Sequence, residues 1–111
     1  MAKTKEESKI GEIVVELFKQ RGLSISKVVV FGSYAAGLQK NDSDIDLIIV
    51  SSDFREKSIF EKVELTTGIG WELVKRTKKP FDLMYYSDIE WEEGNSLIIN
   101  AAKESGKVIY G

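Results

Sequence analysis

Two short groups of residues in the first half of the chain have the chemistry to bind a metal ion and a phosphate. Asp44 and Asp46 open an apolar run, and their spacing would project both side chains from one face of a strand. Gly32-Ser33 follows an earlier apolar run and is separated from Asp44 by ten residues. A glycine lets a phosphate approach the main chain, where a serine hydroxyl and helix N-terminal N–H groups meet its anionic oxygens. Together the two groups predict Mg²⁺ bound between carboxylates and phosphate.

Each group taken alone has an ordinary explanation as well. A glycine-serine pair at a turn is more often a matter of backbone geometry, and paired acids in a surface strand are more often solvated. The metal hypothesis depends on the two groups occurring together, because two carboxylates a pleat apart repel one another and a divalent cation relieves that repulsion.

Asp82 is the candidate for a third carboxylate. It lies between Phe81 and Leu83 in an apolar run, where an acid is out of place unless it faces a cation or solvent. A third carboxylate would complete a two-metal site, in which one ion activates the attacking oxygen and the other neutralises leaving pyrophosphate. The alternative is an acid on the exposed face of an edge strand.

Composition excludes several other kinds of site. The chain of 111 residues has no Cys and no His, so disulfides, thiolate chemistry, serine-histidine triads and most zinc sites are excluded. Its net charge of -2 provides no positive field for a long nucleic acid. With no secretory or membrane-spanning run, we expect a cytoplasmic protein that does not enter a membrane.

The elements that must position the candidate residues follow from hydrophobic periodicity. Apolar residues three and four apart predict an amphipathic helix over residues 6–21. The β-branched run at residues 27–31 predicts a strand buried on both faces, and a second strand is expected over residues 44–50. Residues 33–38 are expected to form a short helical turn, which would place Gly32 and Ser33 at a strand-to-helix junction.

The second half of the chain predicts further helices and strands. Residues 57–76 show a helical pattern that glycines near residue 68 interrupt, and residues 81–86 predict a third strand. Ser87 and Glu90 match a capping box for a last helical region, followed by a strand near residues 108–110. We therefore expect one α/β (α+β) domain over residues 1–111, with helices packed on a small mixed sheet of three to four strands.

These motifs resemble a known family. The run from Gly32 to Gly37, followed by Ser43-Asp44-Ile45-Asp46-Leu47, is similar to the signature of the minimal nucleotidyltransferases of the DNA polymerase β superfamily. The resemblance implies the nucleotidyltransferase fold and transfer of a nucleoside monophosphate, AMP from ATP, to a hydroxyl. It also implies two Mg²⁺ ions at Asp44 and Asp46, with Asp82 as a further ligand and general base, and the β- and γ-phosphates at Gly32 and Ser33.

The sequence departs from the family pattern at Ala36, where members often have an arginine before the second glycine of the loop. Lys40 and Lys79 are candidates to replace its positive charge. Because the chain has little room beyond a catalytic core, the resemblance implies a separate helical partner of the HEPN class, a toxin whose tyrosine would accept AMP. The chain would then be its antitoxin, and whether it also forms a homo-oligomer is open.

Two alternatives remain open from the sequence. The chain could be a binding module that neutralises its partner by contact alone, with a degenerate nucleotide site, and Ala36 favours this slightly. It could instead be a small-molecule nucleotidyltransferase similar to the antibiotic-modifying enzymes, although those usually need a second domain. The three acids favour the enzyme, because a protein that acts by contact alone has no need of them.

Overall fold

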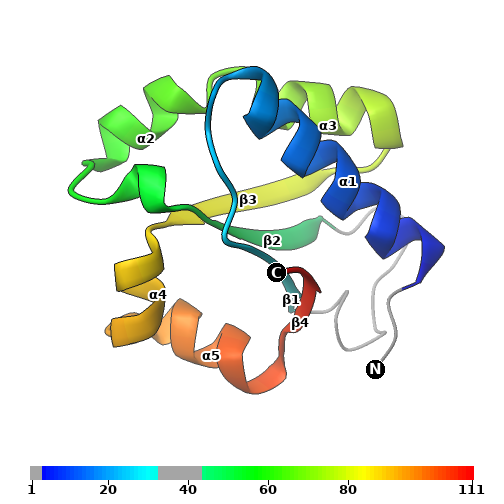
Figure 1. Ribbon diagram of the computed structural model, residues 1–111. Coiled ribbons are helices and arrows are strands. Elements are labelled where there is room, and N and C mark those ends of the chain that lie inside the picture. Colours follow the sequence, from blue (N-terminus) through cyan, green and yellow to red (C-terminus); the bar gives the residue numbers. More distant parts are fainter. Residues whose placement is uncertain (1–3, 33–43) are drawn as a thin grey trace.

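The computed structural model describes residues 4–32 and 44–111, which form a four-stranded sheet with helices on both faces (Figure 1). The strand order is β3-β2-β1-β4, and β2 pairs in parallel with β3 while β1 pairs antiparallel with β2 and β4. This confirms the expected mixed sheet and the α/β fold class. In chain order the elements are α1 (Lys5–Gln20), β1 (Lys27–Phe31), β2 (Ile45–Val50), the 3-10 helix η1 (Ser52–Phe54), α2 (Ile59–Leu65), α3 (Ile69–Thr77), β3 (Phe81–Tyr86), α4 (Asp88–Glu93), α5 (Leu97–Ser105) and β4 (Lys107–Tyr110).

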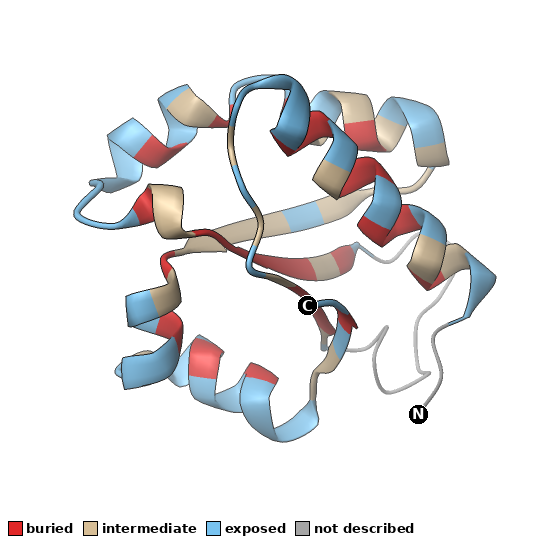
Figure 2. Ribbon diagram, viewed as in Figure 1, coloured by how far each residue is buried: buried red, intermediate tan, exposed pale blue. Residues whose placement is uncertain are grey.

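The two faces of the sheet are covered by different helices. α1 and α3 pack on one face through the buried side chains that the periodicity of the sequence predicts, and Figure 2 shows these residues on the sides of the helices that face the sheet. α4 and α5 cover the other face through Trp91, Ile99 and Ala102. The centre of β2 is buried from both sides, as expected for a strand that is wholly apolar beyond Asp46.

Local signals set the ends of the helices. Ser87 and Glu90 form the expected capping box at the start of α4. The helical pattern over residues 57–76 becomes two helices, because Gly68 adopts a left-handed φ of 86° between α2 and α3. Gly94 breaks the last helical region in the same way, at a φ of 63°. The short helix η1 was not expected from the sequence. None of the helices in the described part of the chain is long and apolar enough to cross a bilayer.

A buried ion pair joins the start of α1 to β4. Glu7 is 4% exposed, and its Oε1 accepts hydrogen bonds from Nζ of Lys107 at 2.7 Å and from the backbone N–H of Thr4 at 2.8 Å. The Glu7 N–H donates in turn to Oγ1 of Thr4, which completes a capping box. Burial by itself raises the pKa of Glu7, but the bonds from Lys107 and Thr4 outweigh it and leave that pKa below its usual value.

Replacing Glu7 by alanine should lower the free energy of unfolding by about 2 kcal/mol, because the N–H of Thr4 loses its acceptor in the capping box and the Lys107 ammonium loses its partner. A lowered pKa in the folded state stabilises the protein above the pKa of the unfolded chain, and this stabilisation is lost as the pH falls through the folded-state pKa. The difference between wild type and variant should therefore narrow below about pH 4. Urea unfolding at several pH values measures this difference in the free energy of unfolding. Glu12→Ala, an exposed change on the same helix, is the control and should have little effect.

Candidate active site

The strand register brings two of the predicted carboxylates together. Asp46 near the start of β2 is the direct partner of Asp82 on β3, and because the strands are parallel both side chains project from the same face. Asp46 also pairs with Phe31 at the end of β1, across the antiparallel ladder. Residues that the sequence separates by 36 positions thus become neighbours at one end of the sheet. Figure 1 shows β2 and β3 side by side.

The alternation expected along β2 is confirmed. Ile45 and Leu47 are buried in the core beneath α1 and α3. Ile48, two residues beyond Asp46, belongs to the cluster beneath α4 and α5. Asp46 is therefore on the α4/α5 face of the sheet, near the start of β2. Asp44 immediately precedes β2 and is exposed.

Asp82 combines the two interpretations offered by the sequence. Its residue is exposed, and β3 is an edge strand, as the solvated alternative requires. The same position is in register with Asp46, as the metal hypothesis requires. Exposure and participation in a site are compatible here, because the site lies at the rim of the sheet.

The main chain at Gly32 lies against the carboxylate of Asp46. Its φ is 74°, a conformation that side chains other than glycine adopt only with strain. A Cβ atom at this position would overlap Oδ2 of Asp46. Glycine is therefore needed for two reasons, the turn after β1 and the room for the carboxylate. The second reason cannot be seen in the sequence, because it depends on the β1–β2 pairing.

The electrostatics of Asp46 follow from this crowding. Partial burial raises the pKa of the Asp46 carboxyl above its usual value, and the nearby carboxylates of Asp82 and Asp44 raise it further. The charged form of Asp46 is thus disfavoured by all three causes. A cation bound between the carboxylates would remove the repulsion and offset the loss of hydration.

The donor set fits Mg²⁺ in its chemistry, since all three side chains offer hard carboxylate oxygens. Within residues 4–32 and 44–111, however, no three acidic side chains are already arranged to hold an ion. Asp44 and Asp82 are exposed, so their side chains can rotate toward Asp46 without repacking the core. The backbone therefore places the carboxylates at one end and the side chains would close on a metal when it binds.

Several of the expected site residues lie outside the described residues. These are Ser33, Ala36 and Lys40, together with the expected helical turn. Lys79, the other candidate to replace the family arginine, is described. Its Nζ pairs with Oε2 of Glu6 at 3.3 Å, on the α1/α3 side of the sheet rather than beside Asp46.

A residue that the sequence analysis had treated only as part of a strand also borders the site. Phe31 is the cross-strand neighbour of Asp46 and packs against the cluster beneath α4 and α5. The signal that could have located it is the antiparallel pairing of the runs before Gly32 and after Asp44, which places the last residue of one run opposite the start of the other.

Comparison with known proteins extends the likeness over the whole chain. The model of the nucleotidyltransferase domain family matches residues 8–109. A Methanocaldococcus jannaschii protein, provisionally named a protein adenylyltransferase, is 30% identical over 107 residues, which cover 95% of this chain and 98% of the relative.

Solved structures show the same fold. A chain of a toxin–antitoxin complex crystallised with AMP-PNP superimposes with a TM-score of 0.65 at 19% identity, covering 97% of this chain and 74% of that chain. A chain from the Shewanella oneidensis complex of tri-AMPylated HEPN toxin with MNT antitoxin gives a TM-score of 0.55 at 17% identity, covering 95% and 72% of the two chains. At these identities the likeness concerns the fold alone.

The family match spans nearly the whole of the described fold. This chain belongs to the nucleotidyltransferase domain family.

Proposed function

We propose that this chain transfers AMP from ATP to a hydroxyl group of a partner protein, a tyrosine of a HEPN-type toxin, and so acts as its antitoxin. The observation that supports it most directly is the register pairing of Asp46 with Asp82 beside Gly32. The name of the M. jannaschii relative supports a protein as the acceptor, and the toxin–antitoxin complexes with the same fold support the class of partner.

In the proposed reaction, Asp44, Asp46 and Asp82 would hold two Mg²⁺ ions, and the main chain at Gly32 with Ser33 would receive the β- and γ-phosphates. The bound Mg²⁺ would neutralise the triphosphate and acidify the acceptor hydroxyl. The hydroxyl oxygen bonds to the α-phosphorus, the bond from that phosphorus to its bridging oxygen breaks, and pyrophosphate leaves with the bonding pair. The proton of the hydroxyl passes to the carboxylate of Asp82, which meets the need for a base in a chain without histidine.

An apolar surface beside the edge strand supports a protein partner. A groove of about 430 Å³ lies between α2 and β3. Ile59 and Val63 line it and are 77% and 57% exposed, and Phe60, which follows Ile59 on α2, is 81% exposed. Large apolar side chains that are exposed together on one helix are typical of interaction sites. Lys62 borders the groove and donates to the backbone oxygen of Tyr85 at 3.1 Å. The α2–β3 groove is lined by Ile59, Lys62, Val63, Leu83, Met84, Tyr85, Tyr86 and Glu90.

Asp46→Asn should abolish transfer of AMP to the partner, because it removes a negative charge from the metal site. It should also raise the free energy of unfolding at pH 7, since it removes a carboxylate that its neighbours repel. A raised pKa means that this cost is present at neutral pH and disappears as the pH falls and Asp46 is protonated, so the gain should vanish in acid. Intact mass of the partner after incubation with ATP and Mg²⁺ measures transfer, and urea unfolding measures stability.

The control for Asp46→Asn is Glu104→Gln, which removes an exposed acid on α5 and should leave both quantities unchanged. Transfer at the wild-type rate in Asp46→Asn would sink the proposal. Absence of transfer in the wild-type protein, despite tight binding of the partner, would favour the alternative of an antitoxin that acts by contact alone.

Gly32→Ala should lower both the rate of AMP transfer and the free energy of unfolding. The loss of transfer should be at least as large as the loss of stability alone would cause. The methyl group would displace the carboxylate of Asp46 and force a strained φ, at a cost of about 1–2 kcal/mol of stability. Gly22→Ala is the matched control, because Gly22 also has a positive φ, of 72°, but its Cβ would meet no atom within 4 Å. Equal losses of transfer in the two variants, at equal stability, would show that Gly32 is needed for the turn alone.

Phe60→Asp should weaken binding of the partner by about tenfold or more, because it puts a charge in the exposed apolar surface beside the α2–β3 groove. Leu97→Asp, which changes an even more exposed apolar residue on α5, should bind normally. Titration of the labelled partner gives both dissociation constants. If Leu97→Asp is the weaker binder, the partner docks on the α5 side instead.

A further inference from the structure

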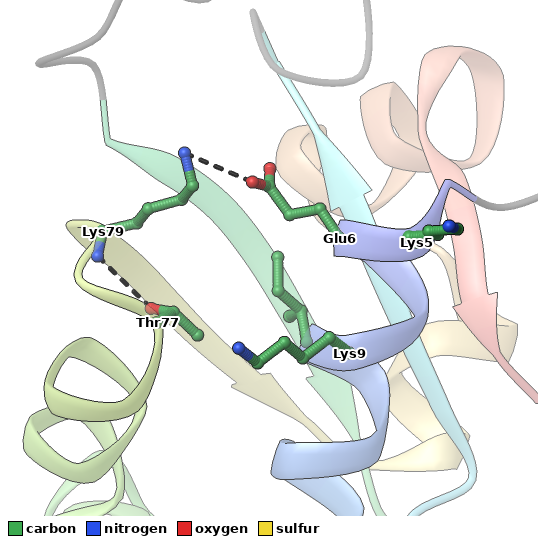
Figure 3. A pocket seen from close by; sticks show the side chains of 6 residues that line it. Lys5, Glu6, Lys9, Thr77 and Lys79 are labelled. Carbon is green, nitrogen blue, oxygen red and sulfur yellow. Dashed lines mark hydrogen bonds and ion pairs between the residues drawn. The ribbon is translucent and has the colours of Figure 1, made fainter.

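A second cavity lies on the opposite face of the sheet from Asp46. It is a hollow of about 210 Å³ between the first turns of α1 and the turn that joins α3 to β3 (Figure 3). Figure 3 shows Lys9 and Lys79 extending from these two sides across the hollow. The residues that line it, called the lysine cavity below, are Lys5, Glu6, Lys9, Ile10, Thr77 and Lys79.

The lysine cavity is positive in a chain whose net charge is negative. Three of its lining residues are lysines and one is a glutamate, against a net charge of -2 for the whole chain. Glu6 is paired with Lys79 at 3.3 Å. Among the described residues, Lys5 and Lys9 have no salt-bridge partner. Both belong to the first turns of α1, where Lys9 extends across the hollow and Lys5 lies at its rim (Figure 3). An anion in the cavity would be attracted by both charges.

The walls of the cavity are fixed by the fold. Ile10, at 1% exposure, is part of the core beneath α1. Oγ1 of Thr77 donates to the backbone oxygen of Leu73 at 2.8 Å and accepts from the N–H of Lys79 at 3.3 Å. The threonine hydroxyl is therefore already bonded and Lys79 is paired with Glu6, so among the described lining residues the ammoniums of Lys5 and Lys9 are left to contact a ligand.

The lysine cavity and the acids lie at the same end of the sheet but on opposite faces of it. Lys79 precedes Pro80, whose backbone oxygen accepts from the N–H of Ile45 at the start of β2. The cavity thus lies at the same end of the sheet as Asp46. It is on the face that α1 and α3 cover, whereas Asp46 is on the face of α4 and α5. A ligand in this cavity is consequently a different group from one held by the carboxylates.

We infer that the lysine cavity binds a phosphate-bearing anion. Lysine ammoniums bind phosphate as point charges with several donors each, and two of them here have no salt-bridge partner within residues 4–32 and 44–111. The volume of 210 Å³ is below the roughly 300–1,000 Å³ of sites for whole drug-sized ligands, so it suits a phosphate or pyrophosphate group rather than a complete nucleotide. That group is either free inorganic anion or the terminal phosphate of a longer ligand that extends into solvent. This inference does not depend on the proposed transfer reaction.

The test is calorimetric titration of the purified chain with inorganic pyrophosphate in EDTA at low salt. Without a divalent cation the carboxylates repel pyrophosphate, so binding under these conditions reports on the lysine cavity. We expect measurable binding that weakens as salt is added. Lys5→Gln combined with Lys9→Gln should weaken it by about tenfold, because two exposed charge contacts are lost.

Matched variants separate this effect from net charge and from the transfer site. Lys19→Gln combined with Lys27→Gln removes the same charge elsewhere and should bind as wild type does. Asp46→Asn should also bind as wild type does, whether or not it transfers AMP, so the failure of one hypothesis is distinguishable from the failure of the other. Equal weakening in the two lysine pairs, or no binding at low salt, would overturn the inference.

A parallel titration with ADP distinguishes the two sources of the phosphate group. Tighter binding of pyrophosphate than of ADP, lost in the Lys5/Lys9 variant, supports a free anion as the ligand. Binding of ADP at least as tight, with the same loss, supports the terminal phosphate of a longer ligand. If the dissociation constant for ADP is the same in the Lys5/Lys9 variant as in the wild type, a phosphate site in this cavity is contradicted.

Discussion

The repulsion between carboxylates held in register on two parallel strands is the constraint on which this end of the molecule depends. Asp46 and Asp82 are direct partners, and partial burial makes the charge on Asp46 still more costly. The same strand, β2, offsets this cost further along its length, because the apolar residues 47–50 are buried from both sides and stabilise the fold. The unfavourable charges are thus at the rim of the sheet and the stabilising burial at its centre. Such an arrangement suits a site that is completed by a cation.

The close approach of Gly32 belongs to the same constraint. Because β1 and β2 are antiparallel, the end of β1 meets the start of β2, and the main chain at Gly32 lies against the carboxylate of Asp46. A phosphate that approaches the glycine therefore also approaches the acid. The two motifs, separated by ten residues in sequence, form one surface through a single strand pairing. β3 is an edge strand, so the α2–β3 groove lies at the same edge of the sheet as the strand that carries Asp82.

Local sequence was enough to predict most of the elements. The spacing of apolar residues in α1 and the β-branched run of β1 each depend on neighbours within the element, so their burial was predicted correctly. The break at Gly68 and the capping box at Ser87 are also local. The helix η1 was missed although its cap is local, since Oγ of Ser51 accepts from the N–H of Asp53 at 3.1 Å. Its Asp53 side chain is held by a distant residue, because the N–H of Ser24 donates to Oδ2 of Asp53 at 2.8 Å, across 29 positions. Trp71, one of the apolar residues in the helical pattern over residues 57–76, is 68% exposed on α3.

For the site, the sequence by itself determined the residue types: two acids on one face of a strand, a glycine before them, a third acid in a later strand, and no histidine or cysteine to compete. Only the tertiary structure decided that β3 pairs in parallel with β2, which puts Asp82 beside Asp46, and that Lys79 faces α1 on the opposite side. The physical reason is that alternation along a strand is a local property of the backbone. Which strands become neighbours, and in which register, depends on the burial of the whole core.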